Sequence, residues 1–164
     1  MEKRRFFILF VFLSVSLVCF AEGEIGGSGI QISSTEYTIY GGGLNAAGII
    51  YFNKIIGVGL FGNLMYIPAD GVIAILTDSL IGGVFRFING DSFSLPICVG
   101  LYGAYLYAFS DGGTAKGANI GPGVNITGQI KFGNGKYFYL RLQGAYGFLD
   151  NGEIFISPSI GIGF

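Results

Sequence analysis

The side chains that could perform acid–base chemistry in this chain are carboxylates, because the sequence contains no histidine. Asp70, Asp78, Asp111 and Glu153 fall in stretches rich in polar residues and glycine, which favour loops. Loop carboxylates are usually solvated charges, and no nucleophile in the sequence has a recognisable base and orienting group. The sequence therefore predicts no catalytic residues, no metal ligands and no enzyme activity.

One glycine motif has the spacing of a nucleotide-binding loop. Residues 57–62 read Gly-Val-Gly-Leu-Phe-Gly, but they fall inside a predicted strand rather than at a strand-to-helix turn. The sequence therefore predicts no cofactor. We expect instead that Gly57 and Gly59 face an interior too narrow for larger side chains.

Composition excludes one class of partner and favours another. Apolar residues make up 51% of the 164 residues, charged residues only 12%, and the chain has 30 glycines and 16% aromatics. Glycine and aromatic residues suit strands better than long helices. The net charge of −1 gives no basic field for nucleic acid, so we expect no nucleic-acid partner.

The first 21 residues have the three-part pattern of a secretory signal peptide. Lys3, Arg4 and Arg5 precede an apolar run from 6 to 20, and Ala21 supplies a small residue before the polar Glu22. The sequence therefore predicts a cleaved signal peptide at 1–21 and a second unit, 22–164, as the mature domain. A retained anchor and a lipid-modified Cys19 are the alternatives.

Turn signals divide the mature chain at regular intervals. Compact signals occur at 53–54, 89–92 and 133–135, and longer polar or glycine-rich breaks occur at 33–36, 68–79, 110–118 and 150–153. The three compact turns are expected at one end of the structure and the four longer breaks at the other. The segments between them predict eight strands, at roughly 23–33, 37–52, 55–67, 80–88, 93–109, 119–132, 136–149 and 154–164.

Within these segments apolar residues alternate with small or polar ones. In 119–132, for example, the even positions are almost all apolar, whereas the odd positions are Asn, Gly, Thr, Gln and Lys. A soluble barrel would carry many charges on its polar face, but this face carries few. The pattern favours a polar interior, and its candidate lining residues are Arg86, Asn125, Gln129, Lys131, Arg141 and Gln143.

The apolar face then lies against lipid. A tilted strand of about 9 to 11 residues can cross a bilayer, and strands in lipid must close into a barrel so that their backbone groups are paired. We therefore predict an all-β fold, an eight-stranded antiparallel up-and-down transmembrane barrel. A helical reading of 93–109 is the alternative, but Pro96 and the steady alternation argue against it.

The inward cations and one apolar stretch allow more than one function. Few acids from the predicted strands are available to neutralise Arg86, Lys131 and Arg141, so we expect water and polar side chains around them in a filled interior, with a weak anion path as the alternative. The apolar residues 71–76 either extend a neighbouring strand or line an access route for small hydrophobic molecules.

The chain ends on a strand with an apolar residue or proline at every even position: Ile154, Ile156, Pro158, Ile160, Ile162 and Phe164. With this ending, the signal peptide and the eight segments, the chain resembles the small eight-stranded outer-membrane barrels of diderm bacteria, the OmpA/OmpX/OmpW-like group. The resemblance implies that Ile156, Pro158, Ile160, Ile162 and Phe164 form a signal for the barrel-assembly machinery. It also implies a monomer in contact with outer-membrane lipid.

Three functions remain open at this point. The first is an integral outer-membrane protein with a structural or surface role and a largely filled interior. The second is a transporter or channel for small hydrophobic compounds. The third is a soluble secreted barrel that binds an apolar ligand inside.

Overall fold

The computed structural model describes residues 22–69, 72–110, 112–148 and 152–164. The predicted signal peptide, 1–21, lies outside these residues. The described chain contains no helix that is long and apolar enough to span a membrane.

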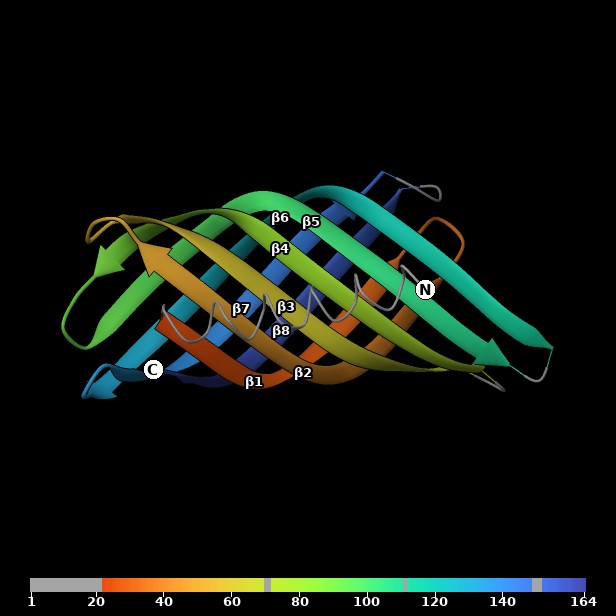
Figure 1. Cartoon of the computed structure of the whole chain (residues 1–164), viewed down its shortest axis with the longest axis horizontal. Helices are drawn as coiled ribbons and strands as arrows, with labels where there is room; N and C mark the ends of the chain where they lie inside the picture. Colours follow the sequence, from red (N-terminus) through yellow and green to blue (C-terminus); the bar gives the residue numbers. More distant parts are fainter. Residues whose placement is uncertain (1–21, 70–71, 111, 149–151) are drawn as a thin grey trace, which may run out of the picture.

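Eight antiparallel strands close into a barrel in sequence order, with β1 paired to β8 (Figure 1). The predicted fold class is therefore confirmed, and residues 93–109, for which a helix was the alternative, lie in a strand. The strands are β1 (Glu22–Ser33), β2 (Thr38–Tyr51), β3 (Ile56–Ala69), β4 (Val72–Asn89), β5 (Phe93–Ser110), β6 (Gly113–Gly133), β7 (Lys136–Gly147) and β8 (Glu153–Gly163).

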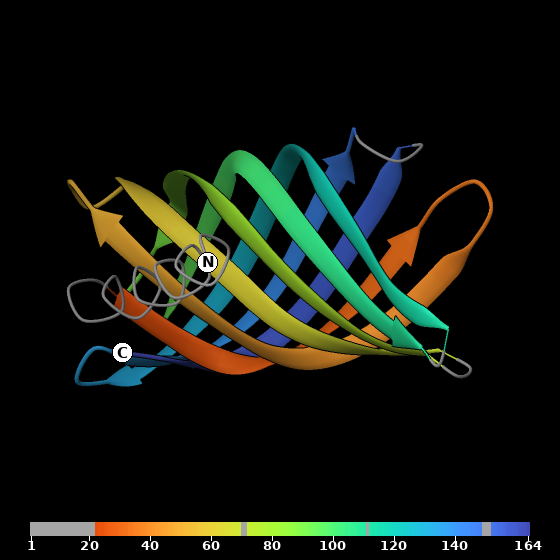
Figure 2. The ribbon, with the colours of Figure 1, turned by 45° about the vertical axis from the view of Figure 1, so that its right-hand side comes forward.

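The start of β1 and the end of β8 meet at one end of the barrel, which we call the termini end. The backbone amide of Gly23 donates to the carbonyl of Phe164 at 2.8 Å, and the amide of Phe164 donates back at 2.9 Å. The β2–β3, β4–β5 and β6–β7 turns lie at this end too, and the other four connections lie at the opposite end, the loop end (Figure 2). This is the predicted arrangement.

The β6–β7 turn shows why its residues are needed. Gly133, Asn134 and Gly135 all have positive φ, at 102°, 51° and 74°. Glycine reaches this region without strain, and asparagine tolerates it better than other side chains. The turn signal at 133–135 therefore corresponds to a real tight hairpin.

Two of the predicted loops are wrong. Most of 68–79 and 110–118 is strand, because β4 begins at Val72 and β6 begins at Gly113, so the 71–76 stretch mainly extends β4. The first residues of β6 pair with β5 alone, since its pairing with β7 starts at Gly123 and Phe148 adds one bond to Ile120. The β5–β6 hairpin therefore projects past β7 at the loop end (Figure 1).

The barrel is apolar on the outside. Along β8 the even residues are exposed, including Ile160 at 65% and Phe164 at 51%, whereas the odd residues Phe155, Ser157 and Ser159 are buried. The same alternation exposes large apolar side chains on every strand. This distribution is the reverse of a soluble barrel and argues against the third function.

The interior is narrow, as expected from Gly57 and Gly59, which are both buried. A Cβ atom on Gly59 would lie 2.6 Å from the Phe61 ring and 2.9 Å from Val84. Real Cβ atoms essentially never come so close, so a larger residue at position 59 would force the Phe61 ring and Val84 to move.

Candidate functional site

The interior of the barrel, the lumen, holds two ion pairs at its termini end. Arg86 of β4 donates through one guanidinium nitrogen to both carboxylate oxygens of Glu22 of β1, at 2.8 and 2.9 Å. The same guanidinium lies 3.8 Å from the centre of the Tyr51 ring. Arg141 of β7 forms the second pair with Glu24 of β1.

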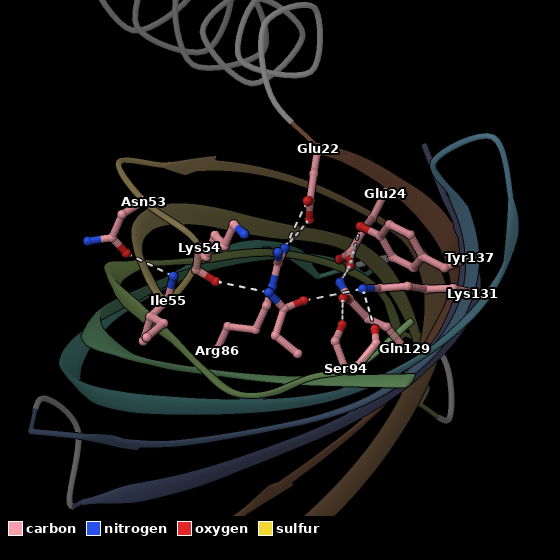
Figure 3. A network of polar contacts seen from close by, with 12 residues as sticks. Glu22, Glu24, Asn53, Lys54, Ile55, Arg86, Ser94, Gln129, Lys131 and Tyr137 are labelled. Atoms are coloured by element: carbon pink, nitrogen blue, oxygen red, sulfur yellow. Dashed lines mark hydrogen bonds and ion pairs between the residues drawn. The ribbon is translucent and has the colours of Figure 1, made fainter. Parts of the chain in front are cut away.

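Glu24 is the centre of a buried polar network (Figure 3). Its Oε1 atom accepts hydrogen bonds from the Tyr137 hydroxyl at 3.1 Å and from the Gln129 amide at 3.2 Å. Gln129 in turn accepts a hydrogen bond from the Ser94 hydroxyl. Side chains from β1, β5, β6 and β7 therefore meet across the lumen.

Arg141 carries this network toward the middle of the barrel. Its Nε atom donates to Thr127 at 3.2 Å, and Thr127 donates to Asn125 at 2.8 Å. Its guanidinium lies 4.6 Å from the Phe61 ring centre and 4.8 Å from that of Tyr139. The cation is thus held by a carboxylate, a hydroxyl and two aromatic faces, which is what a charge without water requires.

The expectation that few acids from the strands could neutralise the inward cations is wrong for Arg86 and Arg141. Glu22 and Glu24 lie in β1, where they pair with Arg86 and Arg141. The first residues after the predicted signal peptide are therefore part of the lumen, and the pairing leaves little net positive charge there.

A third carboxylate lies deeper in the lumen, and the expectation that it is a solvated loop charge is wrong. Asp78 of β4 is only 2% exposed. It accepts hydrogen bonds from the amides of Asn63 at 2.6 Å and Gln143 at 3.5 Å. Both ion pairs of the described residues lie elsewhere, so Asp78 has neutral partners only.

Five of the six predicted lining residues have inward positions. Asn125, Gln129, Arg141 and Gln143 are each 3% exposed or less, and Arg86 is partly buried nearer the termini end. Lys131 is the sixth and lies at the rim, where its ammonium donates to the carbonyl of Gly90 at 2.8 Å and to Asn89 at 3.3 Å.

The candidate lining residues do not include several buried polar residues: Glu24, Asn45, Asn63, Asp78, Ser94, Asn119, Thr127, Ser157 and Ser159. Asp78 illustrates the reason. Its inward neighbours Leu76 and Leu80 are apolar, while Ile75 and Ile81 point outward, so β4 lacks the polar and apolar faces that would have marked Asp78 as inward.

A cavity of about 290 Å³ opens at the loop end of the lumen. Its wall is mostly apolar and includes Ile32, Ile39, Leu76, Leu106 and Phe155, with Glu153 among the polar contributors. A second cavity of about 290 Å³ lies at the termini end and is lined by charged residues, among them Glu22, Arg86 and Lys131. Between the two cavities lie fully buried side chains that include Tyr102, Leu80, Tyr139 and Gln129.

These buried side chains therefore separate a charged end of the lumen from an apolar end. The described residues contain no group of three or more His, Cys, Asp or Glu side chains arranged to hold a metal ion. A lumen of this kind can exclude water from its middle and accept small molecules at its two ends.

Comparisons with known proteins give the fold a context. Neither protein-family models nor curated proteins match the sequence. Among solved structures, the Neisserial surface protein A has a TM-score of 0.70 at 12% identity, over 87% of this chain and 94% of that one. The attachment invasion locus protein of Yersinia pestis has a TM-score of 0.61 at 17% identity, over 87% and 95%.

The outer membrane protein OprG from Pseudomonas aeruginosa is a third such neighbour. Its TM-score is 0.59 at 12% identity, over 87% of this chain and 93% of that one. At these identities the likeness is one of fold, that of the small eight-stranded outer-membrane barrels.

Proposed function

Starting from this fold, we propose that residues 22–164 form an integral outer-membrane barrel of a diderm bacterium, with a structural or surface role, after removal of residues 1–21. The outward apolar surface supports contact with lipid. Because β1 pairs with β8, the barrel has no free strand edge. The backbone groups of every strand can therefore be paired within one chain, as a bilayer requires, so a monomer suffices.

The observation that carries the structural role is the band of buried side chains across the middle of the lumen. Glu24, Gln129, Tyr139 and Arg141 are each no more than 3% exposed, and Tyr102 is fully buried. An open aqueous pore needs a water-filled path through this level, and these side chains occupy it. We therefore propose a largely filled lumen that does not conduct ions steadily.

Conductance in a planar lipid bilayer tests this proposal. Purified, refolded protein is expected to show no steady open channel, because the buried side chains of the band occupy the path. A Y102A/Y139A variant removes two of its largest side chains and should raise the conductance, which shows that the assay can detect an open lumen. Steady anion-selective conductance of the unaltered protein would instead establish the anion path.

We also propose that the outward stripe of β8 is the signal read by the barrel-assembly machinery. Ile156, Pro158, Ile160, Ile162 and Phe164 all point outward and are exposed, so their side chains are not needed to fill the lumen. Phe164 adds backbone bonds to Gly23, and these depend on its main chain alone.

Substitution F164A separates recognition from barrel closure, because it removes the ring and keeps those backbone bonds. We expect a several-fold drop in the amount of protein assembled in the outer membrane of cells, but refolding into lipid vesicles like that of the unaltered chain. F164Y, which keeps an aromatic ring, should assemble normally. Normal assembly of F164A in cells would remove the signal role.

The loop-end cavity supports a second candidate function, the binding or uptake of small hydrophobic compounds. Its wall is apolar, and it opens where the predicted outer connections lie. Ile73 and Ile75, expected as part of an apolar access route, point outward and are 54% and 41% exposed. Leu76 is the residue of that stretch that lines the cavity.

A further inference from the structure

The loop-end cavity has an acidic side chain in an otherwise mostly apolar wall. Glu153, at the start of β8, lines the cavity and accepts hydrogen bonds from the Tyr37 hydroxyl and, at 2.8 Å, from the Asn119 amide. Both donors also line the cavity. Neither ion pair of the described chain involves Glu153, so its charge is held by polar neighbours.

Asp78 adds a second carboxylate beside a residue of the cavity wall. It pairs in register with Ala104 of β5, and Ala104 pairs with Asn119 of β6. Ala104 and Asn119 both line the cavity, so Asp78 lies one strand away from Ala104, at the level of this part of the wall. As shown above, its partners are the neutral amides of Asn63 and Gln143.

The one positive charge in the described cavity wall is not paired with these acids. Lys116 is the only cation among its described lining residues. Its ammonium lies 4.9 Å from the centre of the Tyr107 ring, and Tyr107 is its paired neighbour on β5. That ammonium is therefore engaged on an aromatic face rather than with either carboxylate.

We propose that the loop-end cavity binds small molecules that combine an apolar body with a cationic amine. The body packs on Ile32, Ile39, Leu106 and Phe155, and the ammonium contacts Glu153 within the field of Asp78. A countercharge stabilises the ionised form of a carboxylate, and the partly buried position of Glu153 beside an apolar wall strengthens that attraction. This inference rests on the second candidate function, because it names the solutes that the cavity prefers.

Three water-soluble probes with one skeleton test it: phenethylamine, phenethyl alcohol and phenylacetate. Each is titrated into the protein in lipid nanodiscs, and the methyl NMR signals of Ala104 and Ala108, which line the cavity, are followed. Ala47, which pairs with Glu24 near the termini end, is the remote control. We expect saturable shifts at Ala104 and Ala108 with phenethylamine, weaker shifts with the alcohol and none with phenylacetate.

Charge-removing variants identify the acids responsible. E153Q should weaken phenethylamine binding about tenfold, which corresponds to about 1.4 kcal/mol, and D78N should weaken it by a smaller factor. Neither should change binding of the alcohol. E36Q, which removes an exposed acid in the β1–β2 loop that does not line the cavity, is the matched control and should bind like the unaltered protein.

The outcomes separate the two proposals. Equal affinity for the amine and the alcohol, or unchanged amine affinity in both E153Q and D78N, would overturn the selection of cations while leaving an apolar site. Absence of shifts with every probe would overturn the apolar site as well. A folded barrel in each variant is verified by its heat-dependent mobility on a denaturing gel.

Discussion

Replacing Arg141 by Met is expected to destabilise the barrel by about 3–5 kcal/mol, because removal of one partner leaves a buried charge uncompensated. The side chain of Glu24 is fully buried, and that of Arg141 is 2% exposed. In R141M the carboxylate would keep Tyr137 and Gln129 but lose its cation. Urea unfolding of protein in lipid vesicles measures the change in the free energy of unfolding.

Two variants make this prediction specific to burial. E24Q/R141M removes both charges, so it should recover most of the lost stability. R86M breaks the other ion pair, but Glu22 is 35% exposed and water can solvate it, so the loss should be about 1 kcal/mol or less. Equal losses in R141M and R86M would contradict the idea that desolvation sets the effect.

The strand count could be predicted because turn signals separate the segments, and the inside-out arrangement could be predicted because β6, β7 and β8 have clear alternation. On β7, for example, Leu140 and Leu142 are exposed whereas Tyr139 and Arg141 are buried. A strand with lipid on one side and a polar lumen on the other must separate its residues in this way, and the period of two then shows in the sequence.

The loop end could not be predicted in the same way, because the lumen there is apolar. Ala74 and Leu76 point inward while Ile73 and Ile75 point outward, so both faces of β4 are apolar and the period disappears. The polar residues Thr77, Asp78 and Ser79 then resemble a loop signal, although all three lie in the strand. The part of the loop-end cavity that β4 lines was hidden for the same reason, since Leu76 has apolar neighbours on both faces of the strand.

The ion pairs were hidden for a different reason. Arg86 and Glu22 are 64 residues apart, and Arg141 and Glu24 are further apart still. Alternation assigns each side chain to the inner or outer face of the barrel. It does not show which residues of different strands lie at the same height along the barrel axis. That information depends on the register of the whole barrel, and only the structure provides it.

A row of inward glycines crosses four strands at one level of the barrel. Gly59 pairs with Gly82, Gly82 with Gly100, and Gly100 with Gly123. The last of these lies against large buried side chains, since a Cβ atom on Gly123 would lie 2.8 Å from Leu80 and 3.1 Å from Tyr102. The row therefore allows the wall to come close to the large side chains that fill the middle of the barrel.

Gly100 is the residue of this row with the least space. An added Cβ atom would lie 1.9 Å from the carbonyl oxygen of Ile81 and 2.5 Å from the Cα atom of Gly82. Both contacts are with backbone, which cannot rotate away as a side chain can, so strands β4 and β5 would have to separate. We expect G100A to destabilise the barrel by about 3 kcal/mol, at the upper end of the usual cost of overpacking.

Gly103, three residues along the same strand, is the matched control. A Cβ atom there meets nothing within 4 Å, so G103A should leave the free energy of unfolding unchanged or raise it by about 0.5–1 kcal/mol, since alanine restricts the unfolded chain. If G100A were as stable as G103A, strands β4 and β5 could not be as close at this level as the structure has them. The row would then be a consequence of composition rather than a requirement of the close approach of these strands.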